Sequence, residues 1–184
     1  MSPTEEQRPA FISGSDLLGR AYEYARAAHE GPASFGGTEI AHPVAVAEIL
    51  SGAGFDEEVV AAALLHDVLE DTLHEGAELS ARFPPAVGEL VEVMTEDPSI
   101  GDYPERKAEH RERVLAAGRL PASIYLADKL ARVRRYRADE QPVAPARLEH
   151  YRDTVELFSD AGQDLPFLAE LREELPRLRA AEED

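Results

Sequence analysis

Apolar residues recur at helical spacing along almost the whole chain, and this periodicity limits the possible folds more than any other feature. In residues 15–29, which Ser15 can cap, five side chains fall on one helix face: Leu17, Leu18, Ala21, Tyr22 and Ala25. No segment alternates apolar and polar residues over the length of a strand, and the sequence contains no internal repeat. The periodicity therefore predicts an all-α fold.

Prolines, glycines and capping residues divide the rest of the chain into further predicted helices. Their expected first residues are His42, Asp56, Pro84, Glu105, Pro121, Pro145 and Leu165. The helix from Asp56 is expected to continue through residues 62–72, and Pro176 is expected to kink or end the last helix. Residues 31–39 and 95–104 are predicted as loops. We expect a single domain over residues 10–180, with disordered tails at 1–9 and 180–184.

The composition excludes several classes of protein. The chain has no cysteine, so it can form neither a disulfide nor a thiolate metal site. Its net charge of -18 argues against a nucleic-acid partner, because such complexes depend on basic residues that contact phosphates. No apolar run is long enough to span a bilayer, and the acidic first residues do not resemble a signal peptide. We therefore expect a cytoplasmic protein with no nucleic-acid or membrane partner.

A group of polar residues interrupts an apolar stretch in the segment AALLHDVLEDT, residues 62–72. On a helix, His66 and Glu70 lie four residues apart, as do Asp67 and Asp71, so the four form one polar patch. Neighbouring His66 and Asp67 diverge by roughly 100° and converge only on something between them, for which a metal ion is the natural candidate. Imidazole and carboxylate ligands suit Mn, Fe, Zn or Mg. The alternative is a helix-end histidine beside a capping carboxylate.

Two further residues of ligand type come from other predicted helices. His29 ends an apolar helix face, AYEYARAAH, where a loop begins. Asp128 lies in the apolar stretch SIYLADKL, where a carboxylate without a partner would be costly. A metal shared with residues 66 and 67 would account for both. For Asp128, pairing with Lys129 or with an arginine is the alternative.

These residues lie within a longer pattern. The segment HDVLEDT resembles the HDxxEDT signature of the RelA/SpoT hydrolase branch of the HD superfamily of metal-dependent phosphohydrolases, which includes small single-domain alarmone hydrolases. The resemblance continues in AYEYARAAHEG, AHPVAVAEIL, EVMTED and LADKLARVR, and it covers about residues 15–136. It implies an HD-type helical bundle.

The resemblance also implies roles for individual residues. Four become ligands of one divalent metal: His29, His66, Asp67 and Asp128. Manganese is the usual ion, with Fe, Zn, Co or Mg as alternatives. Glu70 and Asp71 match the acidic pair that orients or deprotonates the attacking water and assists the leaving group. Thr72 is expected to cap or pack, and His42, which matches the HP dipeptide of the family, is expected to cap a helix or to support the ligands.

For the substrate, the resemblance implies a guanosine alarmone whose 3′-pyrophosphate is removed. The loop EGPASFGGTEIA lacks the basic pair that alarmone hydrolases carry before the HP dipeptide. We therefore expect Arg132 and Arg134 to bind substrate phosphates, while Lys129 either contacts phosphate or balances Asp128. The altered loop favours, as an alternative, a phosphatase of simple nucleotides or NADPH in specialised metabolism. A second alternative is a non-catalytic regulator. In each case the partner is a small phosphorylated nucleotide.

The remaining histidines and the aromatic residues are expected to have structural roles. His74, His110 and His150 occur in polar surroundings and are predicted to lie on the surface. Three aromatic residues are expected in the core: Tyr22, Tyr24 and Phe35.

Overall fold

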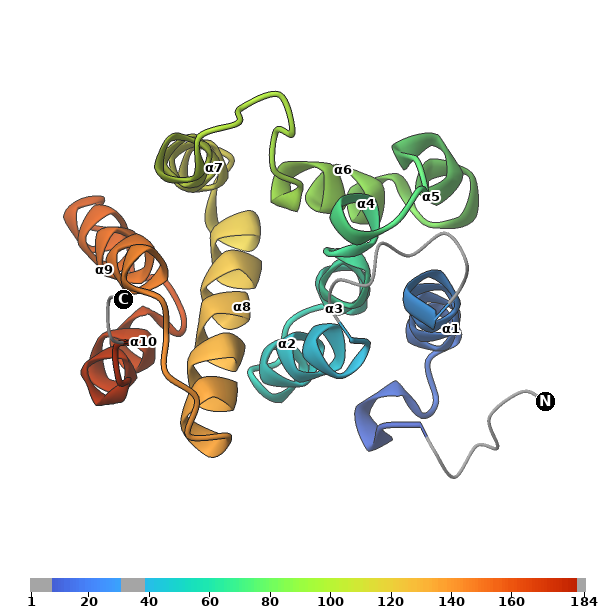
Figure 1. The fold of residues 1–184 in the computed structure, drawn as a ribbon. Coiled ribbons are helices and arrows are strands. Elements are labelled where there is room, and N and C mark those ends of the chain that lie inside the picture. Colours follow the sequence, from blue (N-terminus) through green and yellow to red (C-terminus); the bar gives the residue numbers. More distant parts are fainter. Residues whose placement is uncertain (1–7, 31–38, 182–184) are drawn as a thin grey trace. The chain divides into compact units, whose positions relative to one another are not determined.

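The computed structural model describes residues 8–30 and 39–181, and within these ranges it contains helices and no strand (Figure 1). The predicted all-α class is therefore confirmed. Within the same ranges, no helix combines the length and the apolar character that crossing a membrane requires. The predicted tails and the loop at 31–39 lie almost wholly outside the described residues. The chain divides into two compact units, Met1–Thr95 and Glu96–Asp184, and each is described by itself.

The first unit is built around a helix that is buried on all sides. This helix, α3 (Glu57–Leu65), has seven consecutive buried residues from Val59 to Leu65, which together cover every face of a helix. Three longer helices pack against it: α1 (Asp16–Glu30), α2 (Ala41–Gly52) and α6 (Pro85–Met94) (Figure 1). Full burial of each valine or leucine stabilises the fold by about 1.5–3 kcal/mol, so α3 anchors this unit.

Three short helices complete the first unit. They are η2 (Ala10–Ile12), α4 (Val68–Asp71) and α5 (Gly76–Arg82). Both η2 and α4 contact α1, and α5 contacts α6. The predicted cap of α1 is confirmed, because the Ser15 Oγ atom accepts a hydrogen bond from the backbone N–H of Leu18 at 3.2 Å.

The second unit is arranged around α8 (Arg119–Ala138), which is buried from Pro121 to Ala131. Both α7 (Tyr103–Ala116) and α10 (Leu168–Glu174) pack against α8, and α9 (Pro145–Asp160) packs against α7 and α10 (Figure 1). The last turn, η3 (Leu175–Arg177), contains Pro176, so the predicted end of the final helix at this proline is confirmed. An isolated bridge between Val143 and Ala180 follows it.

The helix predicted through residues 62–72 is wrong in one respect, because the chain turns at His66 and Asp67 and divides it into α3 and α4. Both residues keep nearly helical dihedral angles, with φ -60° and ψ -33° at His66 and φ -87° and ψ -7° at Asp67. Neither residue is a glycine or a proline, so the sequence gives no sign that the helix is divided at this point. Thr72 ends α4, where its buried Oγ1 atom donates a hydrogen bond to the Val68 carbonyl oxygen at 2.7 Å, as expected of a capping residue.

Candidate functional site

The turn between α3 and α4 holds His66 and Asp67 in buried positions. The Nδ1 atom of His66 lies 2.8 Å from the carbonyl oxygen of Ala63. Because a carbonyl oxygen can only accept, Nδ1 carries the hydrogen, and Nε2 faces the Asp67 Oδ1 atom at 3.0 Å. A neutral His66 thus presents a lone pair to a carboxylate oxygen. This arrangement calls for a proton or a metal cation beside the two atoms.

His42, in the first turn of α2, belongs to the same group. Its Nε2 atom lies 4.0 Å from the Asp67 Oδ2 atom, and one of its ring nitrogens lies within 4.8 Å of a ring nitrogen of His66. The two imidazole rings are 5.6 Å apart between centroids. Because α2 begins at Ala41, with Ile40 at the cap position, the expectation that His42 caps this helix is wrong. Its side chain instead extends the polar group of the α3–α4 turn.

His29 lies in the last turn of α1 and interacts electrostatically with the same group. Both of its ring nitrogens are buried and have no hydrogen-bond partner among the described residues. Burial lowers the pKa of His29, although the carboxylates of Asp67 and Asp71 oppose this shift. A neutral imidazole retains a lone pair, so His29 is chemically suited to a ligand role. However, it has no contact with Asp67 as close as that of His42.

These side chains fit a divalent metal. Neutral imidazole and carboxylate are the donors that Mn, Fe and Zn share, and the backbone contact of the His66 Nδ1–H is the support that metal-binding histidines commonly have. Within the first unit, the donors with measured close contacts are His42, His66 and Asp67. A conventional ion pair of protonated His66 with Asp67 would satisfy these two residues but would leave the approach of His42 unexplained.

The predicted acidic pair lies on the next helix, α4. Glu70 is exposed, while Asp71 is half-buried and near enough to influence the pKa of His29. The backbone N–H of Asp71 donates to the Asp67 carbonyl oxygen at 2.9 Å, which ties α4 to the turn. The two carboxylates thus lie in the segment that follows the buried donors. An exposed carboxylate such as Glu70 is accessible to water and to a substrate.

In the second unit, Asp128 is buried in the middle of α8 and lies beside a cation. The Lys129 Nζ atom donates to the Asp128 Oδ2 atom at 2.6 Å, and it lies 4.2 Å from the centroid of the Tyr125 ring. Burial disfavours the charge of Lys129, but the Asp128 carboxylate outweighs this effect and raises the pKa of the ammonium group above its ordinary value. The structure therefore gives Lys129 the role of balancing Asp128, one of the two roles expected for it.

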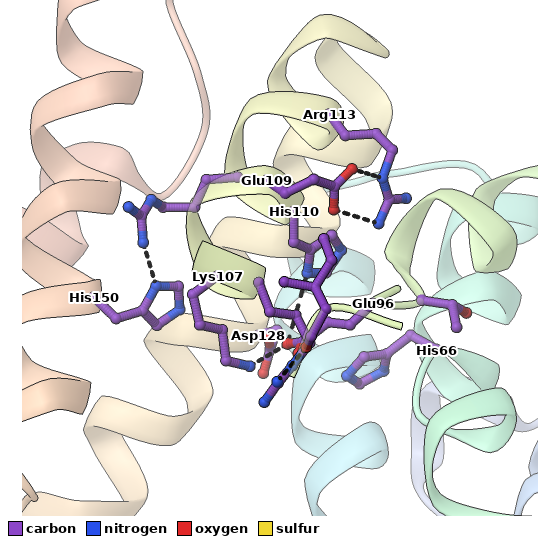
Figure 2. Close-up of polar contacts among 12 residues, drawn as sticks. His66, Glu96, Lys107, Glu109, His110, Arg113, Asp128 and His150 are labelled. Carbon is purple, nitrogen blue, oxygen red and sulfur yellow. Dashed lines mark hydrogen bonds and ion pairs between the residues drawn. The ribbon is translucent and has the colours of Figure 1, made fainter. Parts of the chain in front are cut away.

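A second carboxylate, Glu96, lies at the start of this unit with its side chain 13% exposed, and three side chains of α7 approach it. The Lys107 Nζ atom contacts its Oε1 atom, and the His110 Nδ1 atom lies 3.8 Å from Oε1 (Figure 2). The Arg106 Nε atom donates to its Oε2 atom at 2.8 Å. Burial acts to raise the pKa of Glu96, but the hydrogen bonds from His110 and Lys107 outweigh it and hold the pKa well below its usual range. Glu96 is therefore a largely buried carboxylate that stays ionised.

Two histidines predicted to lie on the surface are buried instead, and that prediction is wrong. His110 is 3% exposed and His150 is 4% exposed. His150 is labelled in Figure 2, and its Nδ1 atom contacts Arg111 Nη1 at 2.8 Å. Arg111 also donates to Asp153 at 3.0 Å. Burial, together with the charges of neighbouring cations, lowers the pKa of His150 to about 2, so it is neutral. Both histidines were hidden by the many charged residues around them in the sequence.

The two arginines predicted to bind substrate have different surroundings. Arg134 donates to Glu170 at 2.5 Å and to Glu174 at 3.0 Å, so it ties α8 to α10. Arg137 joins the same group through Glu174 at 2.6 Å. A phosphate would have to displace two carboxylates to reach Arg134, which favours a structural role for this residue. Arg132 is half-buried on α8.

The comparisons with known proteins bear directly on this arrangement. The family model described as HD domain matches residues 21–160, which include all four predicted metal ligands. The chain belongs to the HD domain family. The matched residues include most of both units. HD domains bind a divalent metal.

The resemblance to the SpoT-type hydrolases is also confirmed. The chain is 39% identical over 123 residues to the guanosine-3′,5′-bis(diphosphate) 3′-pyrophosphohydrolase of Aquifex aeolicus, a match to 65% of this chain and 18% of that protein. It is 34% identical over 151 residues to the bifunctional (p)ppGpp synthase/hydrolase SpoT of Escherichia coli K12, a match to 80% of this chain and 22% of that protein. The chain thus spans about a fifth of the length of these curated relatives.

Solved structures share the fold over nearly their whole length. A metazoan ortholog of SpoT that hydrolyses ppGpp aligns with a TM-score of 0.71 and 27% identity, covering 89% of this chain and 95% of that protein. A Listeria monocytogenes EGD-e protein aligns with a TM-score of 0.67 and 29% identity, covering 74% of this chain and 92% of that protein. The helical architecture of this HD domain therefore matches that of a known ppGpp hydrolase.

The structure adds His42 to the candidate ligands that the sequence predicts. His42 was placed beside the site, whereas its imidazole lies within reach of the Asp67 carboxylate. The signal in the sequence is the HP dipeptide in AHPVAVAEIL, which lies at a helix start and predicts a cap or a residue that supports the ligands. A histidine followed by proline at a helix start fits both roles, so only the three-dimensional position of its ring separates them.

Proposed function

We propose that this HD domain is a metal-dependent phosphohydrolase that removes the 3′-pyrophosphate from a guanosine alarmone. The single observation that carries the proposal is the buried pair of His66 and Asp67, in which a backbone contact fixes the imidazole and turns Nε2 toward the carboxylate. The names of the curated relatives support the same activity and substrate class. The similarity to the ppGpp hydrolase of known structure adds to this support.

We assign the metal, with Mn²⁺ as the first choice, to His42, His66 and Asp67 in the first unit. This assignment gives His42 the direct role that was predicted for His29, because His42 has the measured approach to Asp67. His29 then supports the site as a neutral neighbour. Asp128 remains a predicted ligand on the strength of the sequence pattern. When bound, a divalent metal lowers the pKa of a water molecule and neutralises phosphate oxygens.

The chain's own carboxylates complete the reaction. The exposed Glu70 carboxylate takes a proton from the attacking water as that water forms a bond to the phosphorus atom nearest the ribose. The bond between this phosphorus and the 3′ oxygen breaks at the same time, and the 3′ oxygen leaves with the nucleoside and accepts a proton. Asp71, which is half-buried beside the turn, helps to orient the water. Arg132 is the side chain of α8 that we assign to the substrate phosphates. The products are guanosine 5′-diphosphate and pyrophosphate.

The test is product release by the purified chain supplied with Mn²⁺. Guanosine 3′,5′-bis(diphosphate) should yield pyrophosphate, and the Glu70→Gln variant should lose this activity while retaining the metal. Addition of a chelator should abolish turnover, and Mn²⁺ should restore it. If no phosphorylated nucleotide is hydrolysed under these conditions, the domain is a binding protein and the proposed activity is wrong.

A second candidate is a phosphatase of simple nucleotides or NADPH. It is favoured by the absence of lysine and arginine from residues 31–41, where the alarmone hydrolases carry a basic pair. The same assay distinguishes the two candidates, since this phosphatase would release inorganic phosphate from NADPH with a higher kcat/KM than pyrophosphate from guanosine 3′,5′-bis(diphosphate). A higher value for the alarmone would reject the second candidate.

A further inference from the structure

The first unit contains a cavity of ≈ 480 Å³ at the N-terminal half of α1, between this helix, the start of the described chain and the end of α5. Its volume lies within the range of sites that bind small molecules. The cavity does not include the metal donors. Gly19, which lines it, is ten residues before His29 on the same helix, which corresponds to about 15 Å along the axis. The reaction proposed above makes no use of this cavity.

The charge of the cavity differs from that of the protein. Three arginines and two carboxylates line it, which gives a local excess of one positive charge in a chain with a net charge of -18. One carboxylate, Glu23, is already bound by two arginines: Arg8 through contacts of 3.2 and 2.9 Å, and Arg26 through contacts of 3.3 and 3.0 Å. Glu23 therefore fixes Arg8 at the edge of the cavity without leaving an excess of negative charge.

Two aromatic side chains, Tyr24 and Phe83, line the cavity. The rings of Tyr24 and Phe83 pack edge to face, with centroids 5.6 Å apart. The Tyr24 hydroxyl donates to Glu78 Oε2 at 3.0 Å and lies 3.2 Å from His74 Nδ1, so the ring is held by its polar end. Arg82 is exposed, lies over the Tyr24 ring at 5.5 Å from its centroid, and makes no ion pair with any described residue. It is the cation most available to a ligand.

Gly19 keeps space open in this cavity. A glycine inside a helix is destabilising by roughly 0.5–1 kcal/mol relative to alanine, and packing does not require it at this position. A Cβ atom added at Gly19 would meet only Arg8 Nη1, at an ordinary contact distance of 3.7 Å. Alanine would therefore fit, whereas a long side chain would project into the space beside Arg8.

We propose that this cavity is a second ligand site, which binds a nucleoside monophosphate. The flat base stacks on Tyr24, and the phosphate is held by Arg82 together with Arg8. Neither feature alone selects this ligand. An aromatic surface without cations would suit an apolar molecule, and cations without a flat surface would suit any anion.

The proposal can be tested by calorimetric titration of the metal-loaded protein with guanosine or adenosine monophosphate. Arg82→Ala and Gly19→Met should each raise the Kd by about tenfold or more, because one removes a charged contact and the other fills the cavity. The matched control Gly19→Ala should bind as the natural protein does. Circular dichroism should show the natural helix content in each variant. Asp67→Ala should also retain this binding, since the cavity is separate from the metal donors.

Three results would overturn the proposal. The first is the absence of binding to the natural protein by either nucleotide. The second is inorganic phosphate or guanosine binding as tightly as guanosine monophosphate, which would show that only one half of the ligand is recognised. The third is binding that is lost in Asp67→Ala and kept in Gly19→Met, because the nucleotide would then occupy the metal site. None of these results depends on whether the domain hydrolyses an alarmone.

Discussion

Replacement of Glu96 by glutamine should destabilise the second unit strongly. The Glu96 side chain is only 13% exposed, and it accepts contacts from Lys107 and Arg106, whose side chains are also mostly buried. The Glu96→Gln variant keeps the shape but leaves these two cations without their carboxylate. Because the loss of one partner from a buried ion pair costs about 3–5 kcal/mol, and glutamine keeps some hydrogen bonds, we expect a loss of about 3 kcal/mol in the free energy of unfolding.

The effect should depend on pH in a defined direction. The pKa of Glu96 lies well below its usual range in the folded protein, so the stabilisation is fully present above the ordinary glutamate pKa of 4.5. It is lost as the pH falls toward the folded pKa, by about 1.4 kcal/mol for each pH unit. The difference between the natural protein and Glu96→Gln should therefore be constant from pH 7 to about 5 and smaller by about 1.4 kcal/mol at pH 3.5.

Urea unfolding followed by circular dichroism measures the difference in unfolding free energy between the natural protein and Glu96→Gln at each pH. In thermal unfolding, a loss of about 3 kcal/mol would lower Tm by about 6–12 °C in a chain of this length. Glu109→Gln is a matched control on α7, since Glu109 is 36% exposed and pairs with Arg113 one helical turn away at 2.7 Å. This control should lose less than about 0.5 kcal/mol. Equal losses in the two variants, or a Glu96→Gln difference that does not change below pH 4.5, would refute the assignment of a largely buried, ionised carboxylate.

Four further predictions concern candidate functional residues. His42→Ala should lose bound metal in elemental analysis while His29→Ala retains more of it, and unchanged metal in His42→Ala would contradict the proposed ligand. Glu70→Gln should retain the metal and lose turnover by roughly 10²-fold or more, whereas near-normal turnover would remove its role as a base. Arg132→Asn should change the ratio of kcat/KM for guanosine 3′,5′-bis(diphosphate) and NADPH. Arg134→Ala should leave this ratio unchanged and lower the unfolding free energy by up to about 1 kcal/mol, and the opposite pattern would make Arg134 the substrate cation.

Local sequence patterns predicted the helices well. The cap at Ser15 and the end of the last helix near Pro176 depend on residues next to each other in the chain, so the sequence shows them directly. The turn at His66 and Asp67 was missed because both residues keep nearly helical dihedral angles and neither is a glycine or proline. Only the packing of the segments on either side reveals that the helix is divided.

Pairings between distant residues explain what the local patterns did not show. The α7 sequence is so rich in charge that His110 was expected on the surface, yet its side chain is buried beside Glu96, fourteen residues earlier in the chain. Arg134 was expected to face a substrate, but its carboxylate partners Glu170 and Glu174 are 36 and 40 residues away. Periodicity cannot show such pairs, because they are made when helices pack and not when they form.

The burial of α3 has a consequence for how the donors move. Amide hydrogens of a helix whose residues are buried on every face exchange with solvent only when the surrounding unit opens, so those from Val59 to Leu65 should be among the slowest to exchange in the first unit. The four residues of α4, which include the exposed Glu70, should exchange sooner. His66 is therefore attached to the most persistent part of the unit, while the proposed base belongs to a segment that can open separately. The domain can then reposition its proton acceptor between turnovers without releasing the imidazole that faces Asp67.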